Sequence, residues 1–179
     1  MKKLIMAVLM SISINSFAQS NLDKIFIQKV NAFRAQNGLT TLTYHQTLDS
    51  AAEWHSQYMN TTGVVGHTEI VYHNPQDRIL KYDPTAFKST FDKYIVLENA
   101  AKFTEYAKSL TDEAIATKAF TMWLNSDSHK AAMLTPNIKY VGFGVSINQA
   151  KSEPFPNTFF TGWCTMVVAT TPYTRVISD

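Results

Sequence analysis

The chain has a single cysteine, Cys164, among its 179 residues. One thiol cannot form an intramolecular disulfide, so a disulfide-stabilised scaffold is excluded. Cys164 follows a tryptophan in an apolar segment, which favours a buried thiol over a reactive nucleophile. We therefore expect a domain whose stability rests on its hydrophobic core.

The sequence also lacks long runs of one charge, internal repeats and low-complexity segments. Residues 1–18 hold two of the sixteen basic residues and no acidic one, so the rest of the chain has fourteen of each sign. This balance indicates neither a nucleic-acid-binding surface nor a surface for anionic membranes. We predict one domain, over residues 20–171, and a monomer.

The first 18 residues are typical of a cleaved secretory signal peptide. Lys2 and Lys3 form a basic start, Leu4–Met10 is apolar, and Ser16–Ala18 ends on a small residue. Such a segment is too short to span a bilayer, and no cysteine follows it to carry a lipid anchor. We therefore predict a secreted or periplasmic protein with no integral membrane segment after cleavage, the alternative being a buried N-terminal helix.

Three helices are predicted from apolar spacing and capping residues. The first begins at the capping-box-like Ser20–Asp23 and ends at Asn37–Gly38. The second covers about Thr47–Asn60, and the third begins at Thr111, where two acidic residues favour the positive helix end, and ends near Asp127. The aromatic side chains expected in the core are Phe26, Phe33, Trp54, Phe120 and Trp123.

Two strands are predicted near the C-terminus. Residues 140–147 and 159–169 are rich in β-branched and aromatic residues, and the turn-rich segment 153–157 links them as an antiparallel hairpin. Residues 70–97 have no steady period, and we expect irregular structure there with a short helix at about 77–81. Helices first and strands last favour an α+β fold over a parallel βαβ fold.

Three residues are candidates for a shared site, namely His67, Glu98 and His129. Two neutral imidazoles, a carboxylate and water form a suitable coordination shell for zinc. The same residues can act without metal as an acid–base pair. In the third interpretation each side chain serves only the fold, and Glu98 with Asn99 holds a turn.

The motifs around these residues resemble the CAP superfamily, which comprises cysteine-rich secretory proteins, antigen five and pathogenesis-related-one proteins, in its bacterial secreted branch. The segment 123–134, WLNSDSHKAAML, is similar to the family's tryptophan-to-histidine motif. Gly66–Thr68 and Glu98–Ala101 match its histidine and glutamate motifs, and Gly38–Leu42 matches the exit of its first helix.

The resemblance implies a three-layer α–β–α sandwich with a small antiparallel sheet between helical layers. It also implies a cleft in which histidines and acids can hold zinc or another divalent metal. By motif, His67 and Glu98 carry over directly, and His129 carries over within the bacterial pattern. Asn99 and Ser126 complete the predicted binding cleft.

The chain departs from the family pattern at several positions. Leu97 replaces a glycine before the glutamate, Asp127 and Ser128 replace a proline–glycine pair, and Met166 stands where the last strand often has glutamine. The disulfides of animal and plant members are absent. These departures affect the rim of the predicted cleft more than its centre.

Other polar residues are interpreted as structural. His55 lies on the apolar stripe of the second helix, where a hydrogen-bonded core histidine is favoured over a ligand. Ser126 and His129 stand three residues apart but lack an oriented acid and a strained nucleophile turn, which argues against a serine hydrolase. Ser126 is expected to cap or end a helix.

Three functions remain open from the sequence. The leading hypothesis is an exported CAP-domain binding protein, more a binder than an enzyme, whose ligand is a small molecule, lipid, glycan or peptide. The second is a metal-dependent hydrolase, a peptidase or esterase, using His67, Glu98 and His129. The third is a non-catalytic structural or adhesive exported protein.

Overall fold

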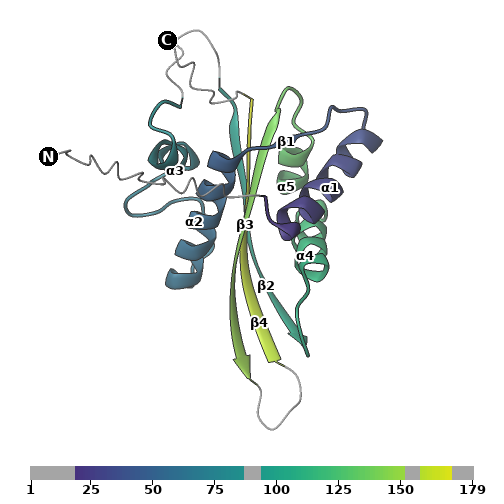
Figure 1. Cartoon of the computed structure of the whole chain (residues 1–179), viewed down its shortest axis with the longest axis vertical. Helices are drawn as coiled ribbons and strands as arrows, with labels where there is room; N and C mark the ends of the chain where they lie inside the picture. The colour runs from purple at the N-terminus through teal and green to yellow at the C-terminus, as the bar shows by residue number, and fades with distance from the viewer. Residues whose placement is uncertain (1–18, 87–93, 152–157, 171–179) are drawn as a thin grey trace, which may run out of the picture.

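The computed structural model describes residues 19–86, 94–151 and 158–170, so the predicted signal peptide lies outside the described residues. In this part of the chain, five helices and four strands form three layers (Figure 1). Helices α2 (Gln46–Thr62) and α3 (Pro75–Tyr82) cover one face of the sheet. Helices α1 (Asn21–Gln36), α4 (Asp112–Leu124) and α5 (Asp127–Met133) cover the other. This is the predicted α–β–α sandwich.

The sheet has the order β1-β3-β4-β2. Strands β3 (Tyr140–Lys151) and β4 (Thr158–Ala169) pair antiparallel, as predicted from the sequence. The two-residue β1 (Thr43–Tyr44) pairs parallel with β3, so the sheet is mixed and not wholly antiparallel. None of the described helices is long and apolar enough to cross a membrane.

Strand β2 (Val96–Ala107) is a feature that the sequence pattern does not predict. It pairs antiparallel with β4 along its whole length and forms an edge of the sheet. Because helical layers lie over both faces, residues of both orientations become buried and the alternation expected of a half-exposed strand is weak. The interpretation of Glu98 and Asn99 as residues that hold a turn is therefore wrong, since both lie in β2.

Helix α1 begins where its sequence predicts. The Ser20 hydroxyl accepts a hydrogen bond from the Asp23 backbone N–H, and the Asp23 carboxylate accepts one from the Ser20 N–H. This reciprocal pair satisfies two backbone donors that have no partner within the helix. The helix ends before Gly38, whose φ of +71° lies in the left-handed region that glycine adopts easily.

The core between the sheet and the α1–α4 layer is aromatic. The rings of Phe26 and Phe143 stack with centroids 3.8 Å apart, and Trp123 meets Phe26 edge-on at 5.5 Å. All three side chains are buried, as is Cys164 in β4. Burial raises the pKa of the Cys164 thiol, which confirms its interpretation as an inert apolar residue.

Helix α2 packs directly on β3 through two glycines. A Cβ added at Gly142 would lie 2.0 Å from the Asp49 backbone nitrogen, and one at Gly144 would lie 2.1 Å from that of Glu53. The absence of side chains therefore allows the helix backbone to reach the strand. This close approach sets the position of every side chain on α2.

Two local predictions differ from the structure. The third predicted helix, expected to end near Asp127, is two helices: α4 stops at Leu124, and Ser126 is the N-cap residue of the separate α5. Trp54, expected in the core, is only half-buried and lies outside the buried apolar clusters of the described residues. Its side chain is instead part of a polar surface between α2 and α3.

Candidate functional site

Glu98 and Asn99 occupy consecutive positions on the edge strand β2, so their side chains point to opposite faces of the sheet. The Glu98 side chain reaches Arg78 on α3 and His67 in the segment after α2. The Asn99 side chain donates a hydrogen bond to the backbone carbonyl of His129 on α5, at 2.9 Å. The strand edge therefore connects both helical layers. We call His67, Glu98, Asn99 and His129 the β2 edge site.

The Glu98 carboxylate is almost wholly removed from solvent, with its side chain 2% exposed. One oxygen, Oε2, accepts a hydrogen bond from the Arg78 guanidinium, and the other, Oε1, lies 3.0 Å from His67 Nδ1. Arg78 Nη1 also donates to the carbonyls of His67 and Tyr72, at 3.4 and 3.3 Å. Arg78 thus holds both the carboxylate and the backbone that carries His67.

A second buried carboxylate, Glu69, lies beside the first. Its Oε1 is 2.7 Å from His55 Nδ1 and 3.5 Å from Arg78 Nη1, and its Oε2 accepts a hydrogen bond from the Trp54 indole N–H at 3.0 Å. Both carboxyl oxygens of Glu69 therefore have polar partners within the protein. An unpaired charge at this depth would be costly, so the partners are essential.

His55 is bonded at both ring nitrogens. Nε2 lies 2.7 Å from the Gly66 carbonyl oxygen, which can only accept a hydrogen bond, and Nδ1 faces the Glu69 carboxylate. The imidazole therefore donates through Nε2, and its Nδ1 shares a hydrogen bond with the Glu69 carboxyl group. His55 and Arg78 lie against Glu69 and Glu98 with all four side chains removed from solvent, and we call these four residues the buried charge quartet.

The two imidazoles of the site, His67 exposed and His129 half-buried, have opposite electrostatic environments. The hydrogen bond to Glu98 raises the pKa of His67, against an opposing effect of burial. Burial, and then the charge of His67, lowers the pKa of His129. The site therefore offers an imidazole that is more readily protonated next to one that is more readily neutral.

A family model with the description "Cysteine-rich secretory protein family", CAP, matches residues 27–165. The chain belongs to this family. Over 122 residues this CAP domain is 27% identical to YkwD, an uncharacterised protein of Bacillus subtilis. The match covers 68% of the chain but 41% of YkwD, so the chain spans less than half of that relative.

Two solved structures share the fold of the CAP domain. An outer surface protein of Borrelia burgdorferi has a TM-score of 0.55 and 20% identity, covering 83% of this chain and 92% of that one. An extracellular protein of Bacillus anthracis that contains an SCP domain has a TM-score of 0.52 and 19% identity, covering 79% of this chain and 39% of that one. At these identities the likeness shows the fold alone.

The predicted site residues are not all in contact in the CAP domain. His67 and Glu98 are bonded, and Asn99 contacts the backbone of His129. Asn99 is buried, so its amide holds α5 in place. Ser126 lies at the start of α5, with its hydroxyl 3.3 Å from that of Ser128. That these residues share a ligand-binding cleft stays a prediction.

A metal does not fit the site as its side chains are placed. Within the described residues, no group of three or more His, Cys, Asp or Glu side chains is arranged to hold an ion. Glu98, the only carboxylate of the predicted set, is bonded through both oxygens, to Arg78 and to His67. This arrangement does not favour metal binding by His67, Glu98 and His129, which stays an untested prediction, and we derive no chemistry from it.

Sequence reasoning missed two members of the buried charge quartet. Glu69 follows His67 by two residues, and Arg78 lies in the segment correctly expected to hold a short helix, but neither carries a local signal of burial. The prediction that His55 is a hydrogen-bonded core histidine is confirmed, because its side chain is fully buried and contacts Glu69 and the Gly66 carbonyl. Its contact with the site, 3.6 Å from Nε2 to Glu98 Oε1, requires the fold.

Proposed function

We propose that this CAP domain is an exported binding protein that takes a carboxylate-bearing ligand, such as a peptide end or an acidic sugar, at the β2 edge site. His67 carries the proposal. Its side chain is 56% exposed, while its Nδ1 is bonded to the buried Glu98. A hydrogen bond at Nδ1 orients the ring and leaves Nε2 as the donor for a ligand.

The buried charge quartet supports binding by a preformed site. Arg78 holds the Glu98 carboxylate and the His67 carbonyl, so the ring needs little ordering when a ligand arrives. Preorganisation of this kind reduces the entropic cost of association. Charge-assisted hydrogen bonds from an imidazolium to a carboxylate are also stronger than neutral ones.

Export is supported by two independent observations. The first 18 residues have the composition of a secretory signal, and the two similar structures belong to an outer surface protein and an extracellular protein. Detection of the mature chain outside the cytoplasm, with Gln19 as its first residue, tests this part. Retention of the first 18 residues in a cytoplasmic product would contradict it.

The binding test compares N-acetylated amino acids with their amides by calorimetry. We expect the carboxylates to bind and the amides to bind about tenfold more weakly, because only the carboxylate makes a charge-assisted bond. His67→Ala should weaken carboxylate binding by about tenfold. His73→Ala removes an exposed imidazole whose Nδ1 lies 3.1 Å from the Glu69 carbonyl oxygen, and it should leave affinity unchanged.

Two outcomes would overturn the proposed function. One is equal affinity for acids and amides; the other is carboxylate binding that His67→Ala does not weaken. A zinc titration of the wild type and His67→Ala addresses the metal separately, since equal zinc binding would exclude the predicted ligand set. Chelator-sensitive hydrolysis of ester or peptide libraries would favour the hydrolase instead.

A further inference from the structure

Lys81, in the last turn of α3, places its ammonium among three aromatic rings. Its Nζ lies 2.9 Å from the centroid of the Trp54 ring, 4.6 Å from that of Tyr82 and 5.6 Å from that of Tyr72. Nζ also donates a hydrogen bond to the Tyr82 hydroxyl at 3.1 Å. Aromatic faces attract cations, so this is a site for a positive charge. We call Trp54, Tyr72 and Tyr82 the aromatic cage.

The central ring of the cage is held by its neighbours. The Trp54 indole N–H donates to Glu69 Oε2 at 3.0 Å, and the Tyr72 ring meets the indole edge-on with centroids 5.8 Å apart. Glu69 is itself fixed by the buried charge quartet. The indole is therefore oriented by contacts that do not involve Lys81.

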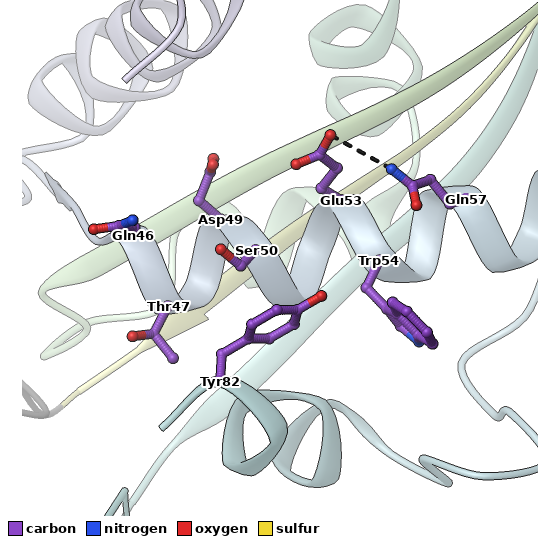
Figure 2. A pocket seen from close by; sticks show the side chains of 8 residues that line it. All are labelled: Gln46, Thr47, Asp49, Ser50, Glu53, Trp54, Gln57 and Tyr82. Carbon is purple, nitrogen blue, oxygen red and sulfur yellow. Dashed lines mark hydrogen bonds between the residues drawn. The ribbon is translucent and has the colours of Figure 1, made fainter. Parts of the chain in front are cut away.

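The cage opens onto a pocket of about 510 Å³ along the outward face of α2. Figure 2 shows Trp54 and Tyr82 on one side of the helix, with Asp49 and Glu53 on the other. Of the eight lining residues, two are acidic and none is basic. Glu53 adds a negative charge to the lining, whereas burial raises the pKa of Asp49 to about 7, so its carboxyl is only partly ionised at neutral pH. The other lining side chains that can hydrogen-bond to a polar ligand are Gln46, Thr47, Ser50 and Gln57.

The Lys81 ammonium occupies the cage at a cost in hydration. Desolvation lowers the pKa of Lys81, so its ammonium gives up favourable hydration to lie among the rings. A free primary amine would give up the same hydration and would also compete with an ammonium tethered nearby. A quaternary ammonium has no N–H groups to desolvate, so it gains the same attraction at lower cost.

We propose that the α2–α3 pocket binds quaternary ammonium ligands of the choline type, whose cation replaces the Lys81 ammonium in the aromatic cage. The hydroxyl end of the ligand then lies toward the amide and hydroxyl side chains along α2. This pocket has no lining residue in common with the β2 edge site, so its occupancy can be tested separately from the proposed function.

The direct test is calorimetric titration of the full-length mature protein with choline. The matched control ligand is 3,3-dimethylbutan-1-ol, which has the same shape without the charge. We expect choline to bind saturably and to quench the fluorescence of Trp54. The neutral compound should bind with an affinity at least about tenfold lower than that of choline. Equal binding of the two compounds, or no binding of choline, would overturn the proposal.

Variants of the cage residues test whether choline binds in the cage or elsewhere on the protein. Lys81→Met removes the tethered competitor and should tighten choline binding by about fivefold or more. Tyr82→Leu should weaken choline binding by about tenfold, while Phe159→Leu, at an exposed aromatic side chain on β4, should leave it unchanged.

Trp54→Leu should also weaken choline binding. If the Trp54→Leu protein does not fold, Tyr82→Leu still decides the test. Choline affinity unaffected by Lys81→Met and Tyr82→Leu would overturn the proposal.

A second experiment decides whether the quaternary ammonium belongs to a lipid headgroup or to a free small molecule. Sedimentation with phosphatidylcholine vesicles, compared with phosphatidylglycerol vesicles, tests a lipid headgroup. Binding to phosphatidylcholine that Tyr82→Leu abolishes indicates a membrane ligand. Binding of choline without binding of the vesicles indicates a free small molecule, and both results support the same cage.

Discussion

The guanidinium of Arg78 on α3 binds the buried carboxylate of Glu98 on β2. Twenty residues separate the two in sequence, and both side chains are removed from solvent. Through this ion pair the short helix α3 is attached to the edge strand, and the segment that carries His67 is held between them. An ion pair removed from solvent therefore supports the most exposed of the candidate site residues, His67.

Replacing Arg78 should destabilise the fold strongly. Arg78→Met leaves Glu98 without its cationic partner in a buried position, and we expect a loss of about 3–5 kcal/mol in the free energy of unfolding. The control is Lys118→Met, because the Lys118–Glu105 pair is 43% and 40% exposed. Surface pairs contribute about 0–1 kcal/mol. Urea unfolding measures both, and equal small losses would show that the buried pair contributes little.

Adding one methyl group to Gly142 should displace α2 from β3. The new Cβ meets helix backbone, which cannot rotate away as a side chain can, so Gly142→Ala should cost about 3 kcal/mol or more. Gly66→Ala is the matched control, because nothing lies within 4 Å of a Cβ at that position. Thermal unfolding of the two variants compares them. A Gly142→Ala protein as stable as Gly66→Ala would contradict the close packing.

The stability of the protein should fall as pH rises from about 4 to 7, because of Asp49. Burial, reinforced by the charge of Asp23, raises the pKa of the Asp49 carboxyl from 3.8 to about 7. The unfolded chain loses this proton at lower pH than the folded one. The folded state is therefore favoured at low pH, and the advantage is lost through pH 7.

Asp49→Asn cannot ionise and should lack this loss. Relative to the variant, the wild type should be less stable at pH 8 than at pH 4 by on the order of 1–2 kcal/mol, after allowance for partial exposure. Urea unfolding at a series of pH values provides the measurement. Asp127→Asn, at a fully exposed carboxylate, controls for the loss of one charge. Wild-type and Asp49→Asn curves that run parallel would disprove the assignment.

The two imidazoles of the β2 edge site should titrate in a definite order. The bond to Glu98 raises the pKa of His67, whereas burial and the His67 charge lower that of His129. Histidine-resolved NMR should therefore give His67 the higher midpoint. Glu98→Gln should lower the His67 midpoint, and His67→Gln should raise that of His129. Identical midpoints in the wild type would mean that the residues do not interact as described.

The local parts of the fold were predictable because their causes lie within a few residues. Ser20 and Asp23 cap α1 through a bond spanning three positions, and the glycine-spaced segment from Tyr140 forms the strand of the predicted hairpin. His67, Glu98 and His129 could be selected because their motifs resemble those of a family. Strand β2 could not be predicted, because its burial depends on helices that cover it from both sides.

The sequence by itself determined the helical stripes, the capping of α1, the C-terminal hairpin and the identity of the two candidate imidazoles, His67 and His129. The tertiary structure alone decided that Arg78 pairs with Glu98, that His55 is bonded between Glu69 and a backbone carbonyl, and that Trp54 faces the ammonium of Lys81. The physical reason is the distance along the chain over which each interaction acts. Capping and periodicity act over one or two turns, whereas pairing of buried charges and rings depends on distances that exist only after the layers have packed.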